Sequence, residues 1–399
     1  MKNYFLIFVL IFIFLSSFAG KSLDYAKHLD DMKLHRNSLV ADLHCDTVLR
    51  MLKGKQISQK DSSGNIDIPK LKEGGVDLEV FACFISTNHP KEDCFNYVNR
   101  EVDSLEVQVE RNKNDIAICT TAKDAKKIIK SGKIAALIGI ENGVAIENNL
   151  DNLEKFYKRG VRILTLTHTS SNDWCISSGD RNPQFNGLTD FGREVIKKMN
   201  ELGMIIDVSH ASESAFWEVL KVTKDPVIAS HSCVYALDPH DRNLTYEQIK
   251  ALAKNGGMVG INFFNAYLSK EFNEKMGDLF ERLKVEMEKV KEEHKDDSLA
   301  IQKAYKEFWG KEEEKIKNIK VDVSLVVDHI DYVVKLVGPD YVGLGSDFDG
   351  VPYLPEGLKD CSQMPEITKE LVKRGYSEKD IKKILGGNFM RVFKKVCKR

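Results

Sequence analysis

Short apolar runs alternate with longer charged segments along most of the chain. The runs are rich in Val and Ile and are bounded by Gly, Asp or Pro, which is typical of buried parallel strands. They occupy residues 39–46, 76–85, 134–141, 161–168, 204–210, 226–231, 258–264 and 341–347. The segments between them, such as 190–202 and 246–254, carry apolar residues at helical spacing. This alternation predicts an α/β fold, a (β/α)8 barrel of the TIM type.

One stretch interrupts the alternation. Residues 266–320, which follow the seventh apolar run, are dominated by Lys and Glu, with apolar residues at helical spacing. This composition predicts a solvated helical pair inserted into the barrel. A lid over the barrel mouth or a dimer surface is the alternative interpretation. We therefore expect one barrel domain over residues 20–399 that carries this insertion.

The first residues predict targeting rather than fold. A cationic start at residues 1–3 precedes an apolar run at 4–15 and a mostly small stretch at 16–20. The apolar run is short for a membrane span, so the pattern predicts a cleaved signal peptide over residues 1–19 and export to a periplasm or the medium. An uncleaved membrane anchor is the alternative.

The overall composition narrows the class of function. The chain of 399 residues has 59 Lys and Arg against 60 Asp and Glu. It therefore has no excess of positive charge that would favour binding to a nucleic acid. An apolar content of 42% is enough for a large core. The eight cysteines include no CxxC pair, which argues against a thiolate zinc site. A soluble enzyme or binding protein is the class that remains.

Metal-binding residue types gather at the ends of the predicted strands, where the active sites of such barrels lie. These residues are His44, Asp46, Glu141, His168, His210, His231 and Asp347. Residues two apart on a strand point the same way, so His44 and Asp46 share a face and Cys45 takes the other. A lone histidine would be interpreted as a core residue, but their convergence with carboxylates favours a functional site.

Imidazole nitrogens and carboxylate oxygens are ligands of zinc and similar divalent ions. Five such ligands exceed the need of one tetrahedral ion, and a bridging carboxylate would use them all. In that arrangement His44 and Asp46 hold one ion, His210 and His231 hold the other, and Glu141 is shared. Two ions can polarise a carbonyl and hold a hydroxide at neutral pH, which suits amide hydrolysis.

Three further residues have chemistry suited to such a site. His168 follows Leu164 and Leu166 on one face, so it is expected to point into the mouth, where it could stabilise an oxyanion or orient the substrate. Arg242 could clamp a carboxylate, although an ordinary surface arginine is the simpler interpretation. Asp347 follows two glycines and could move a proton or receive an amine, or it could merely cap a helix.

With these residues in place, the chain resembles the membrane dipeptidase (renal dipeptidase) family of zinc peptidases. The resemblance spans about residues 38–393 and rests on ordered motifs at residues 42–46, 139–143, 166–169, 206–212, 229–232, 241–243, 345–350 and 386–393. Two features depart from the family pattern. Asn142 stands where many relatives have Gly, and residues 81–85 lack the Trp and Tyr that mammalian members place near the substrate.

The resemblance implies a barrel hydrolase with two Zn²⁺ ions that cleaves dipeptides, L-X and L-D-X among them. The resemblance assigns the five ligands to the two ions in the same way as above, with Glu141 shared. Glu141, His168 and Asp347 become the catalytic residues, and His168, Arg242 and Asp347 contact the substrate at its carbonyl, its carboxylate and its amine. It also implies a homodimer, and the same ligands would accept Mn²⁺ or Co²⁺.

Two alternatives stay open from the sequence. One keeps the barrel and its metals but changes the substrate to cyclic amides, lactones or N-acyl amino acids. Many of those enzymes bridge their metals with a carboxylated lysine, whereas Glu141 stands at the strand end here. The other is a barrel that serves only as a surface binding protein, which has no need for five metal ligands.

Overall fold

The computed structural model describes residues 30–294 and 297–398, so the predicted signal peptide at 1–19 lies outside the described residues. Within those ranges the chain forms nine strands, all parallel to their neighbours. They are β1 Ala41–Cys45, β2 Leu78–Phe84, β3 Ile116–Ile118, β4 Ile134–Glu141, β5 Val161–Thr165, β6 Ile205–Asp207, β7 Ile228–Ser232, β8 Met258–Ile261 and β9 Val342–Leu344. The order and direction of these strands are those of a TIM-type barrel.

Eight of the strands found in the described chain close into a ring. β1 pairs with β2 and β2 with β4, the strands from β4 to β9 pair in order, and β9 returns to β1. Each of these eight strands coincides with one of the predicted apolar runs, with β7 ending one residue beyond its run, so the predicted barrel is confirmed. The short β3 was not predicted. It pairs with the first residues of β4, and its three residues are too few to show a pattern.

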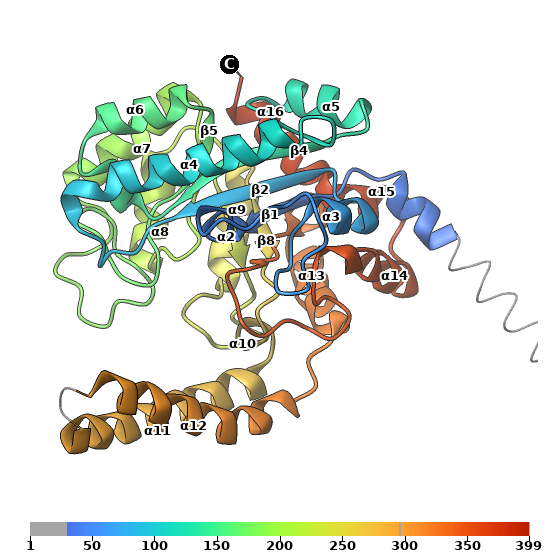
Figure 1. The fold of residues 1–399 in the computed structure, drawn as a ribbon. Helices are drawn as coiled ribbons and strands as arrows, with labels where there is room; N and C mark the ends of the chain where they lie inside the picture. The colour runs from blue at the N-terminus through green and yellow to red at the C-terminus, as the bar shows by residue number, and fades with distance from the viewer. Residues whose placement is uncertain (1–29, 295–296, 399) are drawn as a thin grey trace, which may run out of the picture.

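Most of the described helices cover the outside of the ring (Figure 1). The shorter ones are α2 Thr47–Leu52, α3 Ile68–Gly74, α5 Ala122–Lys130, α6 Leu150–Lys158, α8 Glu213–Val222, α9 Tyr246–Asn255, α10 Asn265–Leu268, α14 Pro365–Lys373, α15 Glu378–Lys382 and α16 Asn388–Val396. The longer ones are α4 Cys94–Arg111, α7 Asp190–Leu202, α11 Lys270–His294, α12 Ser298–Lys317 and α13 Val323–Val337. Among the described residues, none of these helices is both long and apolar enough to cross a membrane.

The barrel interior is filled at one end and left polar at the other. Alternate residues of the strands form an apolar cluster inside the ring, made of Ala41, Leu43, Leu78, Val80, Ala135, Leu137, Ile163, Ile205, Ile228 and Met258. Phe389, Val392 and Phe393 of α16 belong to the same cluster and close the end of the ring at which the strands begin. Polar side chains are therefore concentrated where the strands end, at the mouth.

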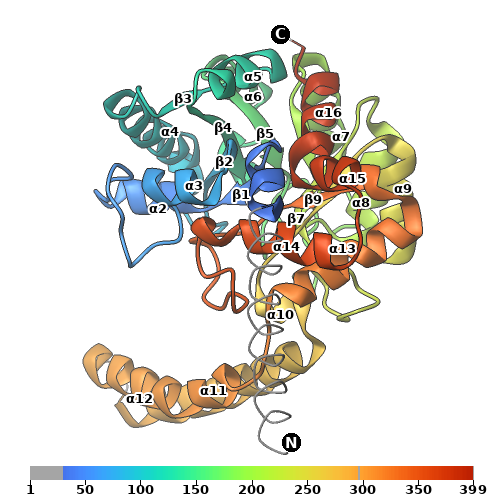
Figure 2. The same ribbon diagram turned by 90° about the vertical axis from the view of Figure 1, so that its right-hand side faces the viewer.

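The insertion predicted at 266–320 is helical and follows the seventh barrel strand, β8. Its two long helices, α11 and α12, run side by side as an arm that projects from the barrel (Figures 1 and 2). Leu279 and Leu283 of α11 are buried, while Phe280 and Tyr305 are 51% and 44% exposed. The lid and dimer interpretations of this arm stay predictions.

Two irregularities in strand pairing shape the mouth. In β1 one extra residue lies between Asp42 and Cys45, and in β7 one lies between Ala229 and Ser232. A bulge of this kind shifts the alternation of the strand, so the side chains that follow it are aimed differently. Leu43 faces the interior cluster, yet His44, the next residue, also points into the mouth, and Cys45 packs in the outer core.

The eight cysteines are free and buried in the described chain, as small apolar residues are. They supply no site in the barrel mouth.

Candidate metal centre

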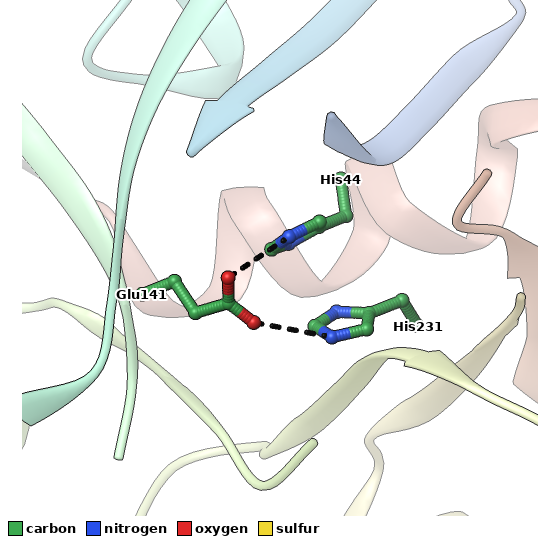
Figure 3. A group of neighbouring side chains, drawn as sticks. All are labelled: His44, Glu141 and His231. Carbon is green, nitrogen blue, oxygen red and sulfur yellow. Dashed lines mark ion pairs between the residues drawn. The ribbon is translucent and has the colours of Figure 1, made fainter. Parts of the chain in front are cut away.

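The five predicted ligands converge at the ends of β1, β4, β6 and β7. Figure 3 shows Glu141 between His44 and His231. Glu141 Oε2 lies 3.6 Å from His44 Nε2, and Glu141 Oε1 lies 3.1 Å from His210 Nε2 and 3.4 Å from His231 Nε2. Asp46 Oδ2 lies 3.6 Å from His44 Nε2. One oxygen of Glu141 thus faces the His44–Asp46 pair, and the other faces the two remaining histidines.

Burial makes this arrangement costly without a cation. The side chains of His44, Glu141 and His231 are almost fully buried. Their atoms His44 Nε2, Glu141 Oε1 and His231 Nε2 have no hydrogen-bond partner among the described residues. Unpaired buried polar groups cost free energy, and these three atoms face a common centre. Nitrogen and carboxylate oxygen atoms so placed fit a divalent ion such as zinc, and the residues therefore suit the predicted metal.

The charge balance of the cluster supports the same conclusion. Burial lowers the pKa of His231, and it lowers that of His210 further, with help from the charge of Arg242. Both imidazoles are thus held in the neutral form that binds metals. Burial would raise the pKa of Glu141, but the charges of His44 and His168 hold it well below its usual value. The ionised carboxylate therefore depends on positive charge close by.

The backbone at the mouth adopts strained conformations. Asn142, His210 and Asp347 have φ angles of 86°, 67° and 62°, in the left-handed region that favours glycine. Such residues cost about 1–3 kcal/mol each and gather at functional sites. Asn142 offsets part of this cost, because its Nδ2 donates to the carbonyl of Ile85 at 2.9 Å. A residue that departs from the family's glycine thus keeps a glycine-like conformation.

His168 reaches the site, but the alternation argument that predicted it is wrong. Leu164 and Leu166 pack in the outer core, and β5 ends at Thr165. The loop that follows the strand carries His168 inward, where its ring lies 4.4 Å from that of His210 and 4.5 Å from that of Phe84. One ring nitrogen of His168 also lies within 4.8 Å of ligand atoms of Glu141 and His210.

Arg242 is an inward residue and not a surface arginine. It is only 6% exposed. Its Nη2 donates to the carbonyl of His231 at 2.9 Å, and its guanidinium lies 5.4 Å from the ring centroid of Tyr267. Its Nε has no partner among the described residues. A donor of this strength, left free in a buried position, is suited to binding an anion.

Asp347 lies on the other side of the centre. Its Oδ2 accepts a hydrogen bond from Asn262 Nδ2 at 2.8 Å, and its carboxylate is grouped within 4.8 Å of ligand atoms of His44 and Asp46. Gly350 makes this approach possible, because a Cβ there would lie 2.1 Å from Asp46 Oδ2 and 2.5 Å from Asp347 Oδ1. Neither Asn262 nor the steric role of Gly350 is marked by a pattern in the sequence.

A cavity of about 270 Å³ adjoins the centre. His210 and Arg242 line it, together with residues of the loops at 176–186 and 211–214. Asp241, which also lines the cavity, forms an ion pair with the exposed Arg181. The cavity therefore connects the histidine side of the centre with the guanidinium of Arg242, whose Nε has no partner among the described residues.

The whole described chain matches a known family. A family model described as membrane dipeptidase, peptidase family M19, matches residues 30–398. The chain is also similar to the solved structure of the probable dipeptidase PvdM from Pseudomonas aeruginosa, with 26% identity, a TM-score of 0.80, and 94% of this chain and 99% of that one covered.

Two other solved structures share the fold. One is a metallopeptidase from Rhodobacter sphaeroides liganded with a phosphinate mimic of the dipeptide L-Ala-D-Ala, with 23% identity, a TM-score of 0.74, and 90% of this chain and all (100%) of that one covered. The other is a metallopeptidase named dipeptidase AC, with 24% identity, a TM-score of 0.75, and 91% and 99% of the two chains covered.

Gly350→Ala tests the steric limit at the centre. The added Cβ would push apart the carboxylates of Asp46 and Asp347, so we expect divalent-ion affinity to fall by about tenfold or more. Metal analysis after dialysis against graded chelator measures this. Gly310→Ala in α12, where a Cβ meets no atom within 4 Å, is the control. Equal metal retention by the two variants would contradict the expected role of Gly350.

Proposed function

The chain belongs to the membrane dipeptidase family, peptidase family M19, and is a metallo-dipeptidase; from this premise we propose that it is an exported enzyme that uses two zinc ions to cleave dipeptides. The position of Glu141 carries the two-ion part of the proposal. Its Oε2 faces His44, and its Oε1 faces His210 and His231. A carboxylate so placed is suited to bridge two ions, one on each side.

Two divalent ions at these positions would supply a polarised substrate carbonyl and a water acidified to near-neutral pH. The chain's own residues would provide the rest. Arg242 would bind the free carboxylate of the dipeptide through its unpartnered Nε. Asp347, fixed by Asn262, would receive the free amine and the proton that passes to the leaving group. His168, beside Glu141 and His210, would donate to the carbonyl oxygen.

Recognition of both ends would limit the substrate to two residues. A longer peptide would place an amide where Arg242 or Asp347 requires a charge, and would leave a buried charge unpaired. Dipeptides of the L-X kind are proposed as substrates, and L-D-X dipeptides as well, which the mimic of L-Ala-D-Ala held by the similar structure from Rhodobacter sphaeroides supports. The donor set would also accept Mn²⁺ or Co²⁺.

Export and assembly complete the proposal. The cationic start and apolar run of residues 1–15, with the small residues that follow, support a cleaved signal over 1–19. Sequencing the N-terminus of the mature protein tests this, because a start at Met1 would favour the membrane anchor. A homodimer is proposed from the family resemblance alone, and the molar mass in solution tests it.

Metal content and dipeptide hydrolysis test the central proposal together. We expect about two zinc ions per chain, with cleavage of Gly-Phe and Gly-D-Phe that is lost on chelation and restored by zinc. Two ions without cleavage of either peptide would move the search to N-acyl amino acids and lactones. A chain that binds no metal, and stays inactive when zinc is added, would overturn the mechanism.

Arg242→Met tests recognition of the carboxylate. Loss of a charged hydrogen bond costs about 1.5–3 kcal/mol, so we expect kcat/KM for Gly-Phe to fall roughly 10- to 150-fold. Gly-Phe amide lacks the carboxylate and would leave the charge of Arg242 unpaired in the wild type, so its hydrolysis is expected not to fall in the variant. Arg181→Met, at an 80% exposed side chain that pairs with Asp241, is the matched control. An equal loss on both substrates would show that Arg242 acts through the fold rather than the carboxylate.

A further inference from the structure

Asp207 is a buried carboxylate that the proposed reaction leaves without a role. It ends β6 inside the ring and is 0% exposed. Among the described residues it accepts four hydrogen bonds. Its Oδ1 accepts from the backbone N–H groups of Ser209 and Ser230 at 3.0 and 2.8 Å. Its Oδ2 accepts from the hydroxyls of Thr165 and Ser230, both at 2.5 Å.

The hydroxyl of Ser230 links this carboxylate to a predicted metal ligand. Ser230 Oγ lies 2.5 Å from Asp207 Oδ2 and 2.7 Å from His231 Nδ1. A serine hydroxyl has a single hydrogen, and a carboxylate only accepts. The hydrogen of Ser230 is therefore donated to Asp207, and Ser230 Oγ must accept a hydrogen bond from the imidazole. His231 then carries its hydrogen on Nδ1.

The other ring nitrogen faces the metal centre. His231 Nε2 lies 3.4 Å from Glu141 Oε1 and has no hydrogen-bond partner among the described residues. With the hydrogen on Nδ1, this nitrogen presents its lone pair to the centre. The backbone is held as well, because the N–H of His231 donates to Ser209 Oγ at 3.1 Å. Both the tautomer and the direction of the ring are therefore set from inside the barrel.

We propose that Asp207 is a positioning residue, which acts through the Ser230 hydroxyl to fix the His231 tautomer that binds the second metal ion. This inference rests on the proposed two-ion centre. Hydrogen-bond partners of this kind typically change metal affinity by about 10- to 100-fold. The ion held by His44 and Asp46 would be affected less, because its side of Glu141 is the opposite one.

The hydrogen bonds that run from His231 through Ser230 to Asp207 form a relay. Asp207→Asn would reverse the direction of these hydrogen bonds with little change of shape. The two backbone N–H donors require an oxygen, so the new NH₂ group would face the hydroxyls of Thr165 and Ser230. The Ser230 hydroxyl would then accept a hydrogen bond from this NH₂ group and donate its own hydrogen to His231 Nδ1. The imidazole would carry its hydrogen on Nε2, in the position that the metal requires.

Two alanine variants separate this relay from simple support of the fold. Thr165→Ala and Ser230→Ala each remove one hydroxyl from the same oxygen of Asp207, at the same distance of 2.5 Å. Of these two hydroxyls, the one on Ser230 also contacts the ring of His231. A purely structural role predicts equal effects of the two variants, whereas the relay predicts that Ser230→Ala weakens one metal position and Thr165→Ala does not.

The experiment is a zinc titration of the purified full chain against graded chelator, with zinc per chain measured by elemental analysis. For Asp207→Asn we expect one ion to be retained and the affinity for the other to fall about 10- to 100-fold, with an unchanged circular dichroism spectrum. Cobalt substitution gives a second readout, because the absorption bands of the second position should change in Asp207→Asn and Ser230→Ala but not in Thr165→Ala.

The outcomes distinguish this inference from the proposed function. A wild-type chain that binds fewer than two ions overturns the two-ion centre itself. A wild-type chain that binds two, with Asp207→Asn equal to it in affinity and cobalt spectrum, overturns only the relay. Equal losses in Thr165→Ala and Ser230→Ala would also overturn it, because support of Asp207 alone would then explain the effect.

Discussion

The buried carboxylate of Glu141 is the constraint around which the barrel mouth is organised. It lies on the last residue of β4 and is only 2% exposed, so its charge must be balanced by the groups that surround it. Three imidazoles approach its two oxygens from β1, from β7 and from the turn after β6. The same carboxylate thus ties together strands that are far apart in the sequence, which is the task of a metal bridge and also a source of rigidity.

The rest of the mouth can be understood as the means of bringing these groups into range. Bulges in β1 and β7 change the direction of His44 and His231, and left-handed backbone turns aim His210 and Asp347 inward. Each device costs stability locally. The apolar cluster inside the ring, sealed by α16, and the larger core beneath the helices offset that cost. Strain is therefore confined to the end of the barrel where chemistry is proposed.

Much of this arrangement could be predicted from the sequence, because it depends on local pattern. Each barrel strand is an apolar run, and the candidate ligands follow such runs directly.

The features that the sequence did not predict have physical reasons. β3 is too short for a pattern, and His168 lies beyond the end of β5, so strand alternation did not apply to it. The buried position of Arg242 depends on contacts with His231 and Tyr267, which composition does not reveal. Asn262 and Asp207 make their contacts through hydrogen bonds to residues of other strands and loops, and no spacing along the chain marks such partners.

Arg242 and His231 also show how the proposed recognition of a carboxylate would be coupled to the proposed metal binding. The guanidinium proposed to bind the carboxylate donates through its Nη2 to the carbonyl oxygen of His231. The ring of that histidine is held from the other side by Ser230 and Asp207. A shift of β7 would therefore move together the group proposed to bind the carboxylate and a proposed ligand of the second ion. Such coupling would keep the distance between Arg242 and His231 constant. A constant distance is required of an enzyme that accepts only substrates of two residues.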